Sequence, residues 1–320
     1  MRPVYISPCD PGDCVRPATL SHLIVTQGET MGTVWRVQAF APPGLDRPGL
    51  ERAVFAVCAQ VIGEMSHFEP GSVLGRFNAM QAGGLLRLPP GFARVLGAAL
   101  YLAEASDGAF NPCLFDIVAA RGFGPAAGCA GPVETAPPDW RALRFDRPTR
   151  MIEQAGGCRL DLSAIAKGYA VDLVADALVA LGCASVLVEI GGEFAGRGLK
   201  PDGQPWWVAL QPAGAGPTDE GPLVALVHGA VASSGPKPGA SGAGPGHIVG
   251  LPAPGGGDPP RMISVLHRSC MMADGWATAL FAAGPGKARA LAEQFGIAAR
   301  IAGADGAAWE SPALKDLGGN

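Results

Sequence analysis

The segment CRLDLSAIAKGYAVDLVADALVALG, residues 158–182, carries the strongest structural signal of this chain. Its first residues predict a short strand, and the rest predicts a long helix for which Gly182 is the expected C-cap. Asp161 and Ser163 stand where the strand ends and the helix begins, and free backbone N–H groups at such a place favour anions. Lys167 follows within the next turns of the helix. By itself the pattern fits an anion site or, as the more common case, an ordinary capped helix with a surface lysine.

A second segment, MMADGWATALF at 271–281, combines an acid and a hydroxyl in apolar surroundings. Asp274 and Thr278 are four positions apart, so they share one face of a helix. Oxygen ligands of this kind suit a hard cation such as Mg²⁺. The alternative is an aspartate that caps a helix and a threonine that bonds to its own backbone. In either case Asp274 is expected to open a helix that Gly284–Pro285 ends.

A third segment, EIGGEF at 189–194, ends a predicted strand in two glycines. Glycines in such a position allow the close approach of a ligand or of another backbone. An ordinary turn is the alternative, and it is the more common one for an isolated motif.

The remaining pattern mixes strands and helices without strict alternation, which favours an α+β fold. Strands, the first as a possible hairpin, are expected at 23–40, 185–194, 206–211, 222–234 and 262–267, and helices at 49–66, 89–108 and 286–295. Stretches rich in Gly and Pro predict loops at 124–139 and 235–246. We expect one domain over 23–310, with an irregular N-terminal tail, 1–22, and a C-terminal tail, 311–320.

Composition narrows the class of protein. The net charge of −4 over 320 residues argues against a nucleic-acid partner, because phosphate binding requires a basic surface. No apolar stretch of about 18 residues occurs, so no membrane span is expected. No signal-peptide pattern is seen, and the expected location is cytoplasmic.

The eight cysteines form no CxxC pair; Cys58 and Cys183 are expected as small buried residues, and a disulfide framework is not expected. The five histidines show no ligand spacing, and the common GxGxxG, P-loop, HExxH and GxSxG motifs are absent.

Six motifs, taken together and in order, resemble those of one family, the FAD:protein FMN transferases or ApbE-like flavin transferases. They are MGTVW (31–35), MSHFEPGSVLGRFN (65–78), DGAFNPCLFDIVAARGFG (107–124), LDLSAIAKGYAVD (160–172), VEIGGE (188–193) and ADGWATALF (273–281). One such motif is weak, whereas six in the family's order and spacing, over most of the chain, are specific.

The resemblance implies a fold and a reaction. The expected fold is α+β and T-fold-related, with a mixed, mainly antiparallel sheet, helices, and an active site between two lobes. The expected reaction is Mg²⁺-dependent transfer of FMN from FAD to a Ser or Thr hydroxyl of an acceptor redox protein, with release of AMP. The expected assembly is a monomer or a homodimer. Hydrolysis of FAD to FMN and AMP, or flavin carriage without turnover, are the alternatives.

The resemblance also implies roles for individual residues. Asp274 and Thr278, with the backbone carbonyl of Ala164, are the expected Mg²⁺ ligands. His247 is the candidate base for the acceptor hydroxyl, and with Asp274 it is expected to be catalytic. The residues expected to line the FAD site are Met31, Phe68, Ala109, Phe110, Asn111, Asp161, Lys167 and Ile248.

One region departs from the family pattern, the segment SSGPKPGASGAGPGHIVGLPAPGGG at 233–257. Pro236 stands where the family has an acid, an aromatic residue is missing, and Gly250 replaces the aspartate of the family's HIIDP motif. Three explanations are open: a different acceptor protein, weaker flavin binding, or loss of transferase activity.

Overall fold

The computed structural model describes residues 2–10, 12, 14–125, 138–211, 221–235, 248, 260–303 and 305–318. Its largest element is an eight-stranded sheet in which every neighbouring pair of strands is antiparallel. Across the sheet the strands are β14 (Ala308–Glu310), β13 (Ala298–Ala302), β12 (Met262–His267), β11 (His228–Ser234), β8 (Glu193–Arg197), β7 (Ser185–Ile190), β3 (Thr33–Ala41) and β2 (His22–Thr30). The family-implied expectation of a mixed α+β fold with a mainly antiparallel sheet is confirmed.

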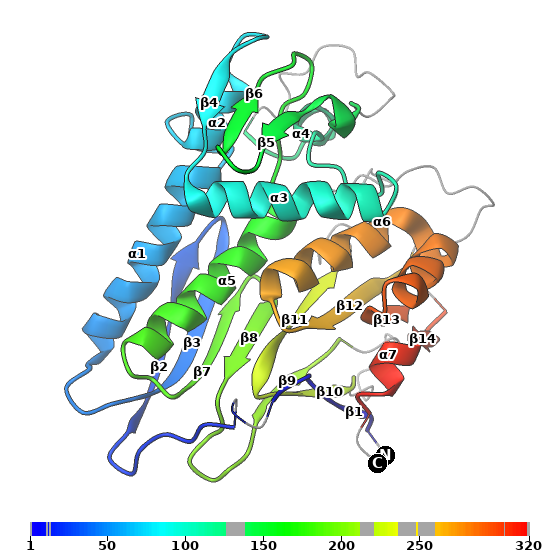
Figure 1. Ribbon diagram of the computed structural model, residues 1–320. Helices are drawn as coiled ribbons and strands as arrows, with labels where there is room; N and C mark the ends of the chain where they lie inside the picture. Colours follow the sequence, from blue (N-terminus) through cyan, green and yellow to red (C-terminus); the bar gives the residue numbers. More distant parts are fainter. Residues whose placement is uncertain are drawn as a thin grey trace.

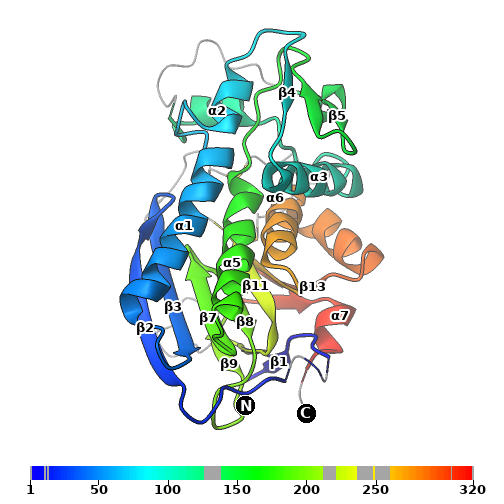
Figure 2. The same cartoon turned by 60° about the vertical axis from the view of Figure 1, so that its left-hand side comes forward.

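Three long helices cover one face of this sheet (Figure 1). They are α1 (Arg47–Met65), α5 (Ser163–Ala180) and α6 (Cys270–Gln294). Helix α5 packs on β7 and β8, and α6 packs on β11 and β12. A fourth helix, α3 (Pro90–Ala105), runs across the ends of these helices and contacts all three (Figures 1 and 2). The apolar core lies between the helices and the sheet, and the buried hydrophobic side chains supply the main driving force for folding.

The second face of the large sheet is covered by a three-stranded sheet in the order β1 (Val4–Ile6), β10 (Leu223–Leu226), β9 (Trp206–Ala209). The N-terminal tail that was expected to be irregular therefore contains a strand, and the expected C-terminal tail contains a short helix. Tyr5 of β1 is buried, and so is Leu314 of helix α7 (Pro312–Lys315). Both belong to one apolar cluster under the large sheet. These elements are only three and four residues long, too short to produce a recognisable period in the sequence.

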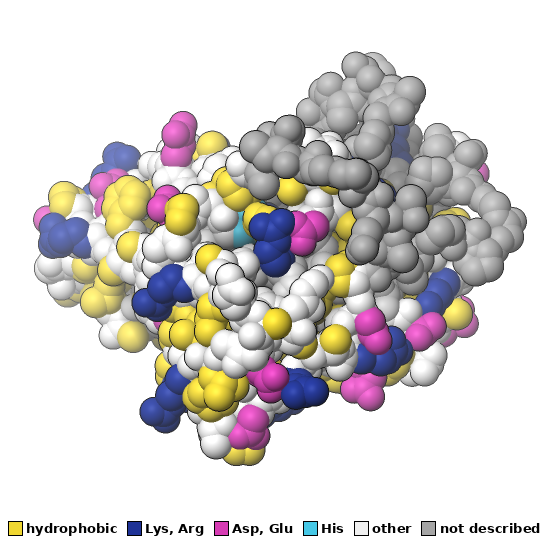
Figure 3. All heavy atoms as spheres, turned by 90° about the horizontal axis from the view of Figure 1, so that it is seen from above, with side chains coloured by type: hydrophobic (Ala, Val, Ile, Leu, Met, Phe, Trp, Pro, Cys, Tyr) yellow, Lys and Arg dark blue, Asp and Glu magenta, His cyan; other side chains and the backbone are white. Residues whose placement is uncertain are grey.

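A smaller unit lies beyond α3, at the top of Figures 1 and 2. It contains a three-stranded antiparallel sheet and two short helices: β4 (Leu85–Arg87), β6 (Met151–Glu153), β5 (Arg144–Asp146), α2 (Val73–Asn78) and α4 (Phe115–Ala120), with the 3₁₀ turn Trp140–Ala142. Seen from above, this part of the surface carries Lys and Arg side chains beside Asp and Glu side chains (Figure 3). A disulfide joins Cys113 and Cys158 within it, a bond that the cysteine pattern did not predict. Cys58 and Cys183 are free and buried, as expected.

Most elements follow the predicted ones, with differences at their ends. The hairpin of β2 and β3 is confirmed. The strand expected at 185–194 is two strands, β7 and β8, joined by a turn, and the strand expected at 222–234 is two strands of different sheets, β10 and β11, separated by Val227. The strand expected before α5, from Cys158, is irregular backbone in the structure. Helix α6 begins at Cys270 rather than Asp274, and it bends at Gly284, whose φ is 75°. None of the helices in the described part of the chain combines the length and the hydropathy that a membrane-spanning segment needs.

Helices α5 and α6 cross at Gly168. A Cβ atom at this position would overlap the backbone carbonyl of Cys270 and lie 2.8 Å from Cβ of Asp274. The crossing therefore requires glycine, because no side chain fits between the two backbones. Gly168 also keeps its N–H close to α6, where it donates to Oδ2 of Asp274 at 3.0 Å.

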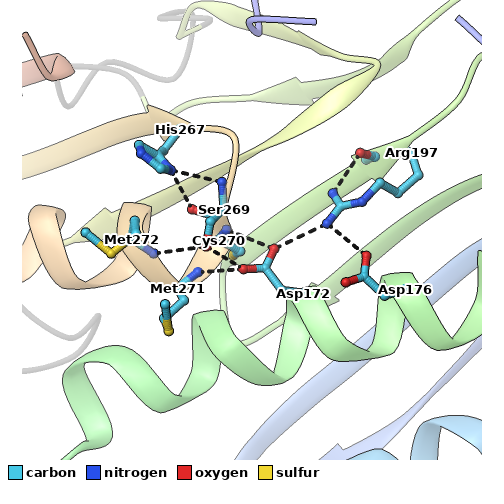
Figure 4. A network of polar contacts seen from close by, with 9 residues as sticks. Asp172, Asp176, Arg197, His267, Ser269, Cys270, Met271 and Met272 are labelled. Atoms are coloured by element: carbon cyan, nitrogen blue, oxygen red, sulfur yellow. Dashed lines mark hydrogen bonds and ion pairs between the residues drawn. The ribbon is translucent and has the colours of Figure 1, made fainter. Parts of the chain in front are cut away.

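Asp172, one turn further along α5, accepts hydrogen bonds from the N-terminus of α6 (Figure 4). Its carboxylate accepts hydrogen bonds from the N–H groups of Cys270 at 2.9 Å and Met271 at 3.0 Å, and from the hydroxyl of Ser269 at 2.7 Å. A negative charge at this point satisfies N–H groups that have no partner within the helix, and it opposes the positive end of the helix dipole. The buried Arg197 bridges Asp172 to the exposed Asp176 (Figure 4).

Replacement of Asp172 by alanine should lower the free energy of unfolding by about 1–3 kcal/mol, because several donors at the start of α6 lose their acceptor. Asp176→Ala is the matched control: it removes the second partner of Arg197, but its side chain is 65% exposed. We expect that variant to lose less than about 0.5 kcal/mol. Chemical denaturation of both variants measures the difference, and equal losses would contradict the capping role of Asp172.

Candidate active site

Asp274 lies one turn inside α6, buried against α5. Only 4% of its side chain is exposed. Its Oδ2 accepts the hydrogen bond from the N–H of Gly168 and lies 3.9 Å from Nζ of Lys167. The sequence motif of Asp274 and the motif of Lys167 are thus brought together by the crossing of two helices about a hundred residues apart in the chain.

Glu193 is a third charged residue at this point, and the sequence analysis did not single it out. It is the first residue of β8, directly after Gly191 and Gly192, which both have positive φ. Its Oε1 accepts a hydrogen bond of 2.6 Å from Nζ of Lys167. Its Oε2 is buried and has no hydrogen-bond partner among the described residues. The signal that could have found it is the acid placed immediately after a double glycine.

Lys167, Glu193 and Asp274, hereafter the Lys167 cluster, hold one ammonium and two carboxylates in a poorly solvated place. Burial raises the pKa of Glu193 and of Asp274, although the lysine charge opposes this. Burial alone lowers the pKa of Lys167, but the two carboxylates outweigh it and hold that pKa above its usual value. With every group ionised the cluster carries one excess negative charge, which an added cation would compensate.

The oxygen atoms around Asp274 are of the kinds that bind a hard cation. Thr278 lies one turn after Asp274 on α6, is half-buried, and its Oγ1 is 3.2 Å from Oγ of Ser234. Ala164 lies in the first turn of α5, one turn before Gly168. Carboxylate, hydroxyl and carbonyl oxygens are the ligands that Mg²⁺ prefers, and the unpartnered Oε2 of Glu193 adds another oxygen nearby. No group of three His, Cys, Asp or Glu side chains suited to a metal occurs in the described part of the chain.

A second group of expected site residues surrounds Asp161, just before α5. Oδ1 of Asp161 accepts a hydrogen bond from the N–H of Ser163 at 2.8 Å and lies 3.2 Å from Nδ1 of His67. Burial opposes ionisation of Asp161, but these contacts prevail and lower its pKa. His67 stacks on Phe68 with ring centroids 4.5 Å apart, and 58% of Phe68 is exposed. Phe68 therefore offers an exposed aromatic ring to a ligand. His67 is a further residue that the sequence analysis missed, because it treated the histidines as scattered.

The run Ala109–Phe110–Asn111 is tied to the same place. The N–H of Asp161 donates to the carbonyl of Pro112 at 2.8 Å, and the disulfide of Cys113 and Cys158 fastens the same two segments. Ala109 and Phe110 are buried, so their side chains contribute mainly to the core. Their N–H groups donate to the carbonyl and the hydroxyl of Ser106 at 3.3 and 2.9 Å, which leaves their carbonyl groups for a ligand. The side chain of Asn111 is engaged locally, accepting from the N–H of Cys113 at 2.8 Å and donating to the carbonyl of Pro138 at 3.0 Å.

The remaining expected residues are less closely connected. Met31 is in the turn between β2 and β3, with φ of 49°. That turn adjoins the turn before Glu193, because the N–H of Gly191 donates to the carbonyl of Val34 at 3.0 Å. Ile248 is half-buried. His247 lies outside the described residues, as does most of the segment that departs from the family pattern.

Known proteins resemble this chain over most of its length. The profile of the ApbE family matches residues 31–301. The FAD:protein FMN transferase of Vibrio cholerae is 31% identical over 297 residues, which cover 88% of this chain and 86% of that protein. The FAD:protein FMN transferase of Haemophilus influenzae is 29% identical over 302 residues, covering 87% and 86%.

Solved structures show the same similarity. The Pseudomonas stutzeri flavinyl transferase ApbE, in its apo form, has a TM-score of 0.79 and 31% identity, covering 94% of this chain and 99% of that one. The flavin transferase ApbE from Vibrio cholerae has a TM-score of 0.79 and 27% identity, covering 92% and 99%. Fold, sequence profile and relatives agree over nearly the whole chain, and this protein belongs to the ApbE family.

Proposed function

We propose that this protein is an FAD:protein FMN transferase that moves FMN from FAD to a Ser or Thr hydroxyl of an acceptor redox protein and releases AMP. The names of its relatives support the transfer of FMN from FAD. The observation that carries the proposal is Asp274, a buried acid held by the N–H of Gly168 beside Lys167 and Thr278. This arrangement gathers an ammonium and hard-cation ligands at one point, as transfer of a charged phosphoryl group requires.

In this reaction the acceptor oxygen forms a bond to the phosphorus of the FMN half of FAD. The bond from that phosphorus to the bridging oxygen breaks, and AMP leaves with that oxygen. The hydroxyl proton passes to a base, for which His247 is our candidate. Lys167 would pair with a phosphate, and its raised pKa keeps it protonated. Mg²⁺, held by Asp274, Thr278 and the Ala164 carbonyl, would neutralise charge on the pyrophosphate.

The flavin side of the proposed site uses the residues around Asp161. Phe68 offers an exposed ring on which the isoalloxazine could stack. Met31, Asp161, Ile248 and the 109–111 backbone would complete the binding surface. Because Phe68 lies in the segment that leads from α1 into the smaller unit and Lys167 lies on α5 of the main body, FAD would lie between the two lobes.

The cellular compartment is a separate proposal. A disulfide between two buried cysteines is typical of an oxidising compartment, which favours an exported protein over the cytoplasmic location expected from the sequence. Peptide mapping of the native protein without reductant tests this, and free thiols at Cys113 and Cys158 would contradict it.

Replacement of Asp274 by asparagine should reduce Mg²⁺-dependent AMP release, measured with FAD and a peptide that carries a Ser or Thr acceptor, by about 10²-fold or more. Asparagine keeps an oxygen for the Gly168 N–H and removes the excess negative charge, so the melting temperature without metal should not fall. Thr278→Val and Thr278→Ser form a matched pair: valine removes the hydroxyl and should lose activity, whereas serine keeps it. Chromatography of AMP measures all three variants. Undiminished release by Asp274→Asn would exclude the metal assignment.

Replacement of His247 by alanine should slow peptide labelling by about 10²-fold while FAD binding is retained. Labelling is followed by mass spectrometry, and binding by quenching of flavin fluorescence. Full-rate labelling by this variant would show that another group takes the proton.

A further inference from the structure

Glu193 is the side chain that contacts Lys167 most closely. Its Oε1 accepts a 2.6 Å charge-assisted hydrogen bond from Nζ of Lys167, whereas Oδ2 of Asp274 is 3.9 Å from the same nitrogen. The first distance is that of a strong hydrogen bond, and the second is too long for one. Two buried carboxylates thus compete for one ammonium, and Glu193 holds it.

The position of Glu193 is fixed by the turn before it. Gly191 has a φ of 68°, and a Cβ there would lie 3.0 Å from Cγ2 of Thr33 and 3.3 Å from Oε2 of Glu193. The glycine therefore allows the turn to close tightly beside the carboxylate. Only 5% of the Glu193 side chain is exposed, so it cannot swing into solvent and release Lys167.

If the carboxylate of Glu193 were absent, Asp274 would be the negative partner left to Lys167 within the described part of the chain. A lysine side chain is flexible enough to close a gap of about 1 Å and form a direct ion pair with Asp274. That pair would neutralise Asp274 and occupy its oxygen, and the carboxylate would then be a poorer ligand for a cation.

We infer that Glu193 is a positioning residue that holds the Lys167 ammonium away from Asp274 and so keeps the Asp274 carboxylate available for Mg²⁺. The inference rests on the function proposed above in taking Asp274 as a metal ligand. It assigns a role to Glu193, the last residue of the VEIGGE motif. The fold requires only the glycine turn of this motif and not its final acid.

The test is a double-mutant cycle of Glu193→Gln and Lys167→Met, with Mg²⁺ alone as the probe. For the wild type, both single variants and the double variant, the melting temperature is measured against Mg²⁺ concentration, and the midpoint is the Mg²⁺ concentration that gives half of the full rise. Glu193→Gln should raise that midpoint by about fivefold or more in the wild-type background and by less than about twofold in the Lys167→Met background. Lys167→Met alone should bind Mg²⁺ at least as tightly as the wild type, because the competing ammonium is gone. Glu193→Asp, which keeps the carboxylate, should stay within about threefold of the wild type.

An equal shift in both backgrounds would contradict the inference, because Glu193 would then act only through its own charge on the cation. Weaker Mg²⁺ binding by Lys167→Met would also contradict it, and this variant serves if Glu193→Gln does not fold. AMP release by the wild type, with FAD and a peptide that carries a Ser or Thr acceptor, is measured in parallel. A wild type that shows the thermal shift without AMP release would refute the proposed function and still test Glu193. A wild type that shows neither would refute both.

Discussion

The close crossing of α5 and α6 at Gly168 is the constraint on which the candidate site depends. Because this glycine has no side chain, the two helix backbones approach closely enough for its N–H to reach Asp274. The same crossing brings Asp172 under the N-terminus of α6. One carboxylate thus sets where α6 begins, and the next turn of α6 delivers the other carboxylate to the centre of the site.

The electrostatics of the site follow from this packing. The apolar core between the helices and the sheet also removes water from the Lys167 cluster. Its carboxylates and its ammonium are therefore stabilised by one another and by bound ligands in place of water. Oε2 of Glu193 is buried and has no hydrogen-bond partner among the described residues, and such an oxygen is costly in a protein that only has to fold. It is understandable in one that receives a charged substrate and a cation there. The packing of α5 on α6 therefore contributes to the stability of the fold and also sets the charge environment of the candidate site.

Much of this could be predicted from the sequence, because local patterns encode it. The spacing of Asp274 and Thr278 predicted a shared helix face, and the β-rich pattern at 23–40 predicted the hairpin. What could not be predicted depends on contacts between distant segments. The pairing of Cys113 with Cys158, and the approach of Glu193 to Lys167, arise only when the chain is folded. The start of α6 was placed too late because Ser269 caps it and Asp172 supplies the second acceptor from another helix.

The most direct test of the account is to incubate the protein with FAD, Mg²⁺ and a peptide that carries a Ser or Thr acceptor, and to follow AMP and peptide mass together. We expect the peptide to gain the mass of FMN and AMP to appear in equal amount. AMP with free FMN and unlabelled peptide would contradict transfer and indicate hydrolysis. Tight FAD binding without AMP would contradict catalysis and indicate a flavin carrier.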